Sequence, residues 1–416
     1  MTTPSRNDLT IENVRPWGGP LSDVVIRQGA VETVTPVSER AAPEPSPGTG
    51  TMDGRGRIII PSFTDAHVHL DSTRLGLPYR PNSADGTLYG QIMNDRQNWR
   101  DAGATVGERA TFALERAIAQ GMTRARSYAQ IDTDCGLERF DGVMLAREKH
   151  RNHASVQVIA FPQSGIVRDP GTAELLHRAL ADGADAIGGI DPCGLDRDPK
   201  SHLDVVFDLA ERHSVPIDIH LHERAELGLF TIDLILERIR ALDMKGRVTL
   251  SHAFALGGLS SDVRDPLLEK LAEWDVSLTT IAPSSATALP LAELVSRGVR
   301  IGLGQDGQRD YWSPFGNADM LHRTWQLAFT NGFRRDDLIE HCVAVATVGG
   351  ASVIDPRVPR LTSILDRPGI AGGDRADFVI LDGETVASAV MDQLPDRTVI
   401  HDGEVVADGL HLSPIS

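Results

Sequence analysis

Short apolar runs alternate with amphipathic segments through the central part of the chain. Segments such as residues 107–120 and 203–213 place apolar residues at positions i, i+3, i+4 and i+7, which is typical of helices lying on a sheet. Eight apolar runs read as strands, and they are GRIIIPSF, TRARSYAQ, VQVIAFP, AIGGI, VPIDIHL, VTLSHAF, VSLTTIAP and VRIGLGQD. Eight such units over roughly 300 residues predict an α/β fold, a (β/α)₈ TIM barrel over residues 61–360. An open, doubly wound sheet is the alternative.

Both ends of the chain carry a different pattern, in which short alternating strands are separated by turns such as D-G. At the N-terminal end these strands are expected at residues 9–14, 23–29 and 30–36, and at the C-terminal end at residues 377–383, 397–403 and 404–409. We therefore predict one small β-sandwich domain formed jointly by residues 1–60 and 361–416.

Polar residues with metal-binding or acid/base side chains stand where four of the predicted barrel strands end. The C-terminal rim of such a barrel is where active sites are built from several strands. The residues are His67 and His69 at the end of the first strand, His220, His222 and Glu223 at the end of the fifth, His252 in the sixth, and Asp306 at the end of the eighth. A lone H-x-H pair is weak evidence, but four strand ends together indicate a site.

Three imidazoles and one carboxylate form a donor set that suits zinc or ferrous iron and leaves a position for water. His220 and His222 point to the same side of a strand, so either could be the ligand beside His67 and His69. Satisfied core or surface histidines are the alternative interpretation. A second metal would need a bridging lysine near the fourth strand, and no lysine follows the third run until Lys200. We expect one divalent metal ion, zinc or iron.

The remaining polar residues supply candidates for proton transfer. Glu223 is the candidate general acid/base, and His252 would polarise the water or stabilise developing charge. Asp306 would serve both as a metal ligand and as a base that accepts a proton from the water.

Composition narrows the partners and the compartment. The chain has 416 residues, 41 Lys and Arg against 58 Asp and Glu, and a net charge of -17. Binding to phosphate backbones or anionic lipid needs an excess of positive charge, so nucleic acid polymers and membranes are not expected partners. No signal peptide or long apolar segment is visible, and the three cysteines are widely spaced, so we expect a cytoplasmic protein.

The motifs PSFTDAHVHLD, FPQSGI, IDIHLHE, TLSHAF, GLGQDGQRDYWSPFGNADML and GIAGGDRADFVILD together resemble the amidohydrolase superfamily, and within it the cytosine deaminase group. The resemblance implies that His67, His69, His220 and Asp306 hold a single metal ion, with Glu223 as the proton shuttle and His252 orienting the water. It further implies that Gln163 reads the edge of the substrate ring and that Trp312 forms an aromatic wall over it. A loop amide and a core tryptophan are the alternative roles.

Two positions depart from the cytosine deaminase pattern. Gly307 stands where that group has a second acidic residue after the metal aspartate, and Arg126-Ser127-Tyr128 stands where a histidine is usual. Gly307 would either widen the pocket beside Asp306 or serve a turn with positive φ. The segment DGQRDYWSPFGNADM instead is similar to relatives that remove an alkylamine from a triazine ring.

These observations predict a metal-dependent hydrolytic deaminase that uses a metal-activated water on a small nitrogen heterocycle, a cytosine-like aminopyrimidine or an analogue. The first alternative is an amidohydrolase that releases an alkylamine from a triazine ring or cleaves a cyclic amide. The second is a non-catalytic barrel used for binding or assembly. The expected partner is a small heterocyclic substrate, and the chain is expected to form a homo-oligomer.

Overall fold

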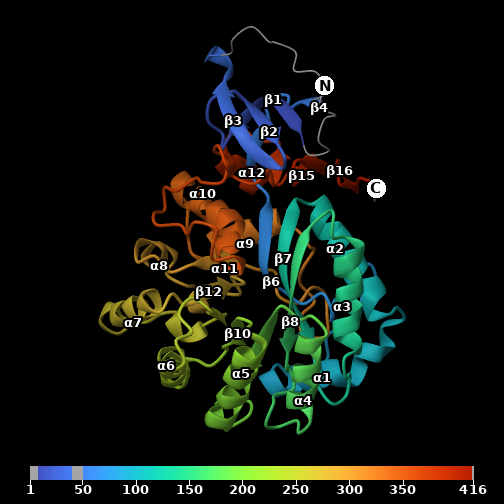
Figure 1. The fold of residues 1–416 in the computed structure, drawn as a ribbon, viewed down its shortest axis with the longest axis vertical. Coiled ribbons are helices and arrows are strands. Elements are labelled where there is room, and N and C mark those ends of the chain that lie inside the picture. The colour runs from blue at the N-terminus through green and yellow to red at the C-terminus, as the bar shows by residue number, and fades with distance from the viewer. Residues whose placement is uncertain (1–7, 40–49, 415–416) are drawn as a thin grey trace.

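The architecture comes from a computed structural model that describes residues 8–39 and 50–414. Eight parallel strands lie in chain order and form a nearly closed barrel (Figure 1). They are β6 (Phe63–Val68), β7 (Met122–Gln130), β8 (Ser155–Phe161), β9 (Ala186–Ile190), β10 (Ile217–His220), β11 (Val248–Ser251), β12 (Ser277–Thr280) and β13 (Ile301–Leu303). The predicted (β/α)₈ barrel is confirmed.

Helices alternate with the strands and cover the outside of the barrel (Figure 1). They are α1 (Leu88–Asn98), α2 (Val106–Ala119), α3 (Glu138–Lys149), α4 (Thr172–Ala181), α5 (Pro199–His213), α6 (Ala225–Ala241), α7 (Ser261–Glu273), α8 (Leu291–Ser296) and α9 (Met320–Thr330). Helix α2 shows why these segments are helical. Thr105 and Glu108 form a capping box at its start, and Ala110, Leu114 and Ile118 make one fully buried stripe.

A longer helical stretch runs from Asp336 to Ile354 and consists of α10 (Asp336–Ala344), a π-helical segment (Val345–Gly349) and α11 (Gly350–Ile354). By length and composition alone it could cross a membrane. However, 78% of its apolar window is buried inside the molecule. A Cβ at Gly350 would lie 3.0 Å from the Cβ of Thr64 in β6, so the stretch packs directly on the barrel as a core helix does.

A separate mixed sheet is built from strands at both ends of the chain, in the order β17-β16-β15-β14-β5-β1-β2-β3, with β4 paired to β1. The N-terminal strands are β1 (Leu9–Pro16), β2 (Ser22–Arg27), β3 (Ala30–Pro36), β4 (Gly50–Asp53) and β5 (Ile58–Pro61). The C-terminal strands are β14 (Phe378–Leu381), β15 (Arg397–His401), β16 (Glu404–Asp408) and β17 (His411–Leu412), with α12 (Val386–Asp392) between the first two.

The two ends of the chain meet through backbone and side-chain contacts in this sheet. Strand β5 pairs antiparallel with β14, and Ile11, Val24, Phe378 and Ile380 share one buried apolar cluster. The joint assembly of the two termini, expected from the sequence, is therefore present. Figure 1 shows this terminal sheet on one end of the barrel.

One predicted strand belongs to the other sheet. The run GRIIIPSF was expected to be the first barrel strand, but its residues Ile58–Pro61 form β5 of the terminal sheet, and the barrel begins at Phe63. All four residues of β5 and all six of β6 are buried, and only the buried Ser62 stands between them, so no exposed residue marks the boundary between the two sheets. His67 still lies at the end of the first barrel strand, as the sequence predicted.

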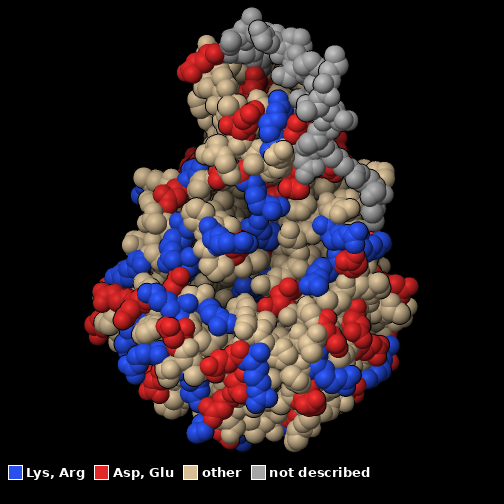
Figure 2. Space-filling view, in the orientation of Figure 1, with Lys and Arg blue, Asp and Glu red and all other residues tan. Residues whose placement is uncertain are grey.

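An ion pair joins the terminal sheet to the barrel. Arg397 in β15 donates from Nη1 and Nη2 to the two carboxylate oxygens of Asp319, at 2.7 and 2.9 Å. Asp319 also accepts from the backbone N–H of Leu321 and so caps α9. Between this sheet and the barrel, Figure 2 shows basic side chains gathered on the visible face, while acidic and basic groups are interspersed over the rest of it.

Candidate metal centre and active site

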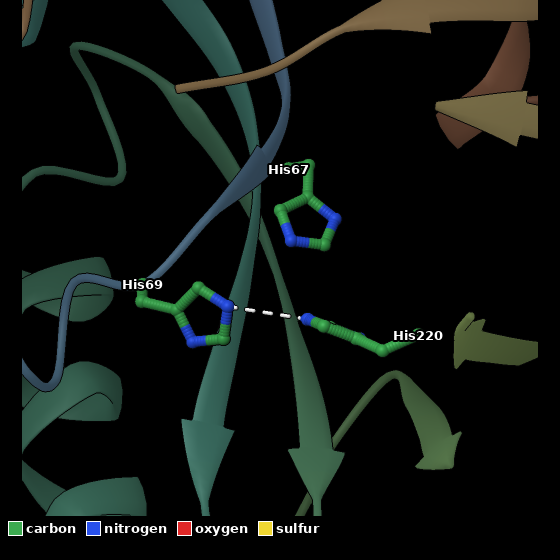
Figure 3. Close-up of side chains that lie close together, drawn as sticks. All are labelled: His67, His69 and His220. Atoms are coloured by element: carbon green, nitrogen blue, oxygen red, sulfur yellow. Dashed lines mark hydrogen bonds between the residues drawn. The ribbon is translucent and has the colours of Figure 1, made fainter. Parts of the chain in front are cut away.

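Three histidines from two barrel strands meet at the C-terminal end of the barrel. His67 comes from β6, His69 follows it, and His220 ends β10. Their ligand nitrogens all lie within 4.8 Å of one another, and Nε2 of His69 is 3.2 Å from Nε2 of His220 (Figure 3). All three side chains are buried. The structure thus brings together the three histidines that the family resemblance implies as ligands.

Asp306 reaches the same point because β13 closes the barrel against β6. The backbone N–H of Asp306 donates to the carbonyl of His67 at 2.8 Å, and the N–H of His69 donates to the carbonyl of Asp306 at 3.4 Å. Oδ1 of Asp306 then lies 3.5 Å from Nε2 of His67 and 3.4 Å from Nε2 of His69. Burial alone would raise the pKa of Asp306, but the close approach of His67 and of the other surrounding histidines holds it well below its usual range.

The histidines present nitrogens that suit a metal ion. The Ser251 hydroxyl donates to Asp218 at 2.6 Å, so it can only accept from Nδ1 of His67, which is 3.0 Å away. Nδ1 of His67 therefore carries the proton, and Nε2 keeps a free lone pair with no hydrogen-bond partner among the described residues. Burial lowers the pKa of His67 and, more strongly, of His220, which keeps both rings neutral as metal ligands require.

His252 stands beside this cluster. One of its ring nitrogens lies within 4.8 Å of ligand atoms of His67 and Asp306, and neither nitrogen has a hydrogen-bond partner in the described part of the chain. The residue adopts a φ of 69°, a left-handed conformation that turns its side chain at the end of β11. It can therefore contact either an ion or a water next to the ion, and burial lowers its pKa well below the usual value.

His222 is hydrogen-bonded to a carboxylate outside the ligand cluster. Its Nδ1 lies 2.7 Å from Oδ2 of Asp191, and its backbone N–H donates to Oδ1 of the same carboxylate at 2.7 Å. Burial would lower the pKa of His222, but the Asp191 charge and hydrogen bond raise it above its ordinary value. The ring stacks on His252 with centroids 4.4 Å apart. Of the two candidate ligands in this segment, the structure places His220 in the cluster and pairs His222 with Asp191.

Glu223 is buried but turned toward backbone amides. Its Oε1 accepts from the N–H groups of Cys193 and Gly194 at 2.8 and 2.7 Å, and Oε2 accepts from the Thr231 hydroxyl. Among the described residues His222 lines the main cavity, whereas Glu223 does not. Burial raises the pKa of Glu223 above its usual value, against the lowering effect of these hydrogen bonds.

A cavity of about 690 Å³ opens above the metal-binding cluster. His69, His220 and Asp306 form part of its wall, and both Gln163 and Trp312 line it as the resemblance implies for substrate-binding residues. The volume is in the range of ligand pockets for small molecules.

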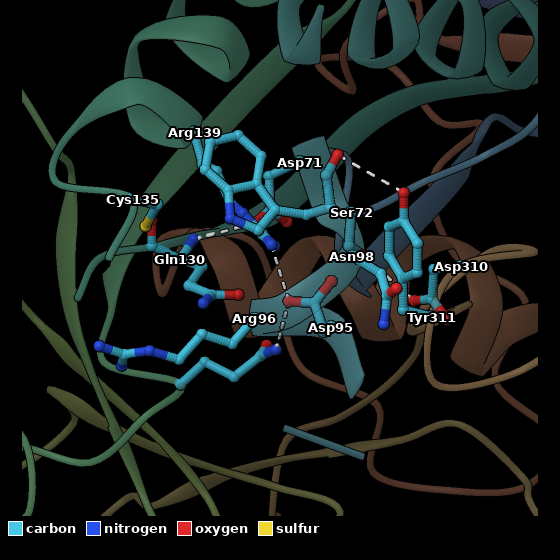
Figure 4. Close-up of polar contacts among 12 residues, drawn as sticks. Asp71, Ser72, Asp95, Arg96, Asn98, Gln130, Cys135, Arg139, Asp310 and Tyr311 are labelled. Atoms are coloured by element: carbon cyan, nitrogen blue, oxygen red, sulfur yellow. Dashed lines mark hydrogen bonds and ion pairs between the residues drawn. The ribbon is translucent and has the colours of Figure 1, made fainter. Parts of the chain in front are cut away.

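The amide of Gln163 is hydrogen-bonded to a buried ionic network, of which Figure 4 shows Asp95, Arg139 and Asp71. Its Nε2 donates to Oδ2 of Asp95 at 3.2 Å, which leaves Oε1 as the free group of the amide. Asp95 in turn pairs with Arg139 at 2.8 Å, and Arg139 lies 3.4 Å from Asp71. Burial raises the pKa of Asp95 to about 6, against the effect of Arg139. Gln163 therefore offers the cavity a hydrogen-bond acceptor.

The space beside Gly307 is not open. A Cβ built on Gly307 would lie 1.9 Å from Oδ2 of Asp310, so the carboxylate of Asp310 fills the position where a side chain would begin. The expectation of a wider pocket at this point was wrong. The alternative, a turn with positive φ, does not hold either, because Gly307 is not among the glycines with positive φ.

Sequence reasoning missed Asp191, Asp95 and Asp310. Asp191 directly follows β9, so the same strand-end rule that identified the histidines would have found it. Asp95 and Asp310 lie on a helix and in a loop, respectively, where an acidic residue carries no positional signal.

Comparisons with known proteins agree with this geometry. A sequence profile described as "Amidohydrolase family" matches residues 99–407. The crystal structure of N-isopropylammelide isopropylaminohydrolase from Burkholderia multivorans is 37% identical, covers 98% of this chain and 100% of that one, and superposes with a TM-score of 0.89. N-isopropylammelide isopropyl amidohydrolase from a Pseudomonas strain is 27% identical over 85% of this chain and 87% of its own. A 5-methylcytosine deaminase structure from Klebsiella pneumoniae is 26% identical, covers 95% and 97%, and gives a TM-score of 0.79.

The metal-binding cluster can be tested by removing one histidine at a time. His220→Ala should lose tightly bound metal, because the ion would lose one of its histidine ligands. His222→Ala is the matched control two residues away, and it should keep the metal, because its ring is bound to Asp191. Elemental analysis of both purified variants measures the metal content. Loss of metal from His222→Ala with retention in His220→Ala would reverse the two roles.

Proposed function

The chain belongs to the amidohydrolase family, and on that premise we propose that it releases an alkylamine from an oxo-triazine ring by hydrolysis of the exocyclic carbon–nitrogen bond. The family makes it a hydrolase of carbon–nitrogen bonds in cyclic amidines. The observation that carries the finer proposal is the similarity, over nearly the whole chain, to a solved isopropylammelide hydrolase. The triazine reaction, the first alternative from the sequence, is thus favoured over deamination of a cytosine-like ring.

The cytosine-like reading has weaker support from the same comparisons. The 5-methylcytosine deaminase shares the fold and the reaction type, but it is less similar to this chain than the isopropylammelide hydrolase in both sequence and structure. A non-catalytic barrel is disfavoured because the buried ligand cluster is complete, with His67, His69, His220 and Asp306 brought together. The homo-oligomer and the cytoplasmic location remain predictions from the sequence.

We propose a single zinc or iron ion held by these four residues. Lys200, the first lysine after β8, lies on the exposed surface of α5 and pairs with Asp204, so it is not available to bridge a second ion. When bound, the ion would activate a water molecule and polarise the ring carbon that is attacked.

The residues of the chain then control the protons. Hydrolysis adds the water oxygen to the ring carbon and needs one proton on the leaving amine nitrogen before the carbon–nitrogen bond breaks. His252, with unpartnered ring nitrogens next to Asp306, can accept a hydrogen bond from the attacking water and orient it. Trp312 and Phe161 line the cavity and would hold the ring between apolar surfaces.

Glu223 is proposed as the group that carries the proton to the leaving amine. Its raised pKa favours the protonated form that a proton donor requires. Delivery of the proton requires the carboxyl group to turn from the amides of Cys193 and Gly194 toward the cavity.

A panel of ring amines tests the proposed reaction. Metal-loaded protein should release isopropylamine from an N-isopropyl dioxo-triazine faster than it releases ammonia from cytosine, because the comparisons favour the former ring. Chromatographic measurement of both amines, at matched substrate concentrations, gives the two values of kcat/KM. A clear preference for cytosine would contradict the triazine proposal and support the hypothesis of an aminopyrimidine deaminase.

A second prediction concerns Glu223. Glu223→Gln should retain metal but lose about 10² to 10⁴ in kcat, since it removes the proposed proton carrier without removing a ligand. Glu226→Gln, on the exposed start of α6, is the matched control and should keep full activity. Steady-state rates and metal content are measured together. Unchanged kcat in Glu223→Gln would show that its carboxylate only stabilises the loop at Cys193.

A further inference from the structure

Asp310 occupies an unusual position in the cavity wall. Asp306, Gly307 and Asp310 all line the cavity, and Oδ2 of Asp310 lies where a Cβ at position 307 would stand. Any residue other than glycine at position 307 would displace this carboxylate. Because Gly307 has no positive φ, the glycine is explained by the side chain beside it and not by its own backbone.

One oxygen of the Asp310 carboxylate is held by two backbone amides, and the other can accept a further hydrogen bond. Its Oδ1 accepts from the backbone N–H groups of Trp312 and Ser313, at 2.8 and 2.9 Å, and Oδ2 accepts from the Ser72 hydroxyl at 3.1 Å. A carboxylate offers about four acceptor positions, so the three bonds leave Oδ2 able to accept another. Asp310 is 9% exposed, and it lines the cavity.

We propose that Asp310 is a specificity-determining residue that accepts a hydrogen bond from a ring N–H of the substrate, an inference that depends on the proposed function. A carboxylate at this position favours a substrate whose ring edge donates a hydrogen bond. Gln163 adds a second acceptor, because its amide N–H₂ is bound to Asp95 and its Oε1 is free. Two acceptors on the wall favour an oxo-ring that carries N–H groups beside its carbonyls over a ring with bare nitrogens in those positions.

The electrostatics of the site agree with this assignment. Burial raises the pKa of Asp310 to about 6, and the charge of Asp306 adds to this effect, while the two amides and Ser72 oppose it. The buried Asp310 carboxylate needs a hydrogen-bond donor from the substrate. A ring nitrogen that offers only a lone pair would leave the carboxylate without a partner. Figure 4 shows Tyr311 and Ser72 near Asp310.

The test must separate ligand recognition from the structural role of Asp310 in capping the loop. In Asp310→Ser the hydroxyl can still accept from the N–H groups at 312 and 313, but the carboxylate is lost. In the double variant Gly307→Asp with Asp310→Ser, a carboxylate returns to the same space from the neighbouring position. Asp310→Asn is a further variant of nearly unchanged shape, to be used if Asp310→Ser fails to fold.

Calorimetric binding to the metal-loaded proteins gives the readout, with 1,3,5-triazine-2,4,6-trione as the donor-bearing ring and its N,N′,N″-trimethyl derivative as the ring without N–H groups. The trione should bind Asp310→Ser about 10- to 150-fold more weakly than the unchanged protein, and the double variant should recover most of this loss. The trimethyl ring should bind the unchanged protein and Asp310→Ser with equal affinity.

The other outcomes overturn the proposal in distinguishable ways. Equal binding of the trione to the unchanged protein and Asp310→Ser would remove Asp310 from recognition while leaving the triazine reaction intact. An equal loss for both rings, without recovery in the double variant, would assign Asp310 a structural role only. If the trione does not bind the unchanged protein, the proposed function and this inference fail together.

Discussion

The site depends on the closure of the barrel between its first and last strands. Two backbone hydrogen bonds join His67 and His69 to Asp306, and these same residues carry the side chains of the metal-binding cluster. The approach is so close that a Cβ at Gly304 would lie 2.5 Å from the Cβ and carbonyl oxygen of His67. Glycine at position 304 is therefore required by packing, and the strand pairing that completes the fold also assembles ligands from distant parts of the chain.

Behind the cluster, a buried polar network fixes the orientation of its members. Arg126 in β7 donates to Asp218 in β10 at 2.7 Å, and Asp218 accepts from Ser251, which holds Nδ1 of His67. Three barrel strands and β6 are thus linked by side chains as well as by their backbones. The buried histidine nitrogens of this site left without a hydrogen-bond partner among the described residues are Nε2 of His67, Nδ1 of His220 and both nitrogens of His252, and each such nitrogen costs about 1–3 kcal/mol. A bound metal ion would offset that cost.

The sequence predicted the elements and the ligands better than it predicted the surroundings. Period-2 and helical patterns located the strands and helices, because each of those segments buries one side or both sides. The boundary at Pro61 was not predicted, since β5 and β6 are both fully buried and only Ser62, itself buried, separates them. Asp310 was not predicted from the sequence for another reason. Its role depends on the fold of a loop that brings it against Gly307, and no spacing rule connects residues three apart in an irregular segment.

X-ray absorption on the zinc-loaded protein is the most direct test of the central claim, that barrel closure assembles one site from His67, His69, His220 and Asp306. We expect a first shell of nitrogen and oxygen atoms at about 2.0–2.2 Å, with imidazole scattering beyond it. A sulfur shell at about 2.3 Å would contradict it. So would a second metal at about 3.5–4 Å, because the described residues around the cluster provide no bridging ligand.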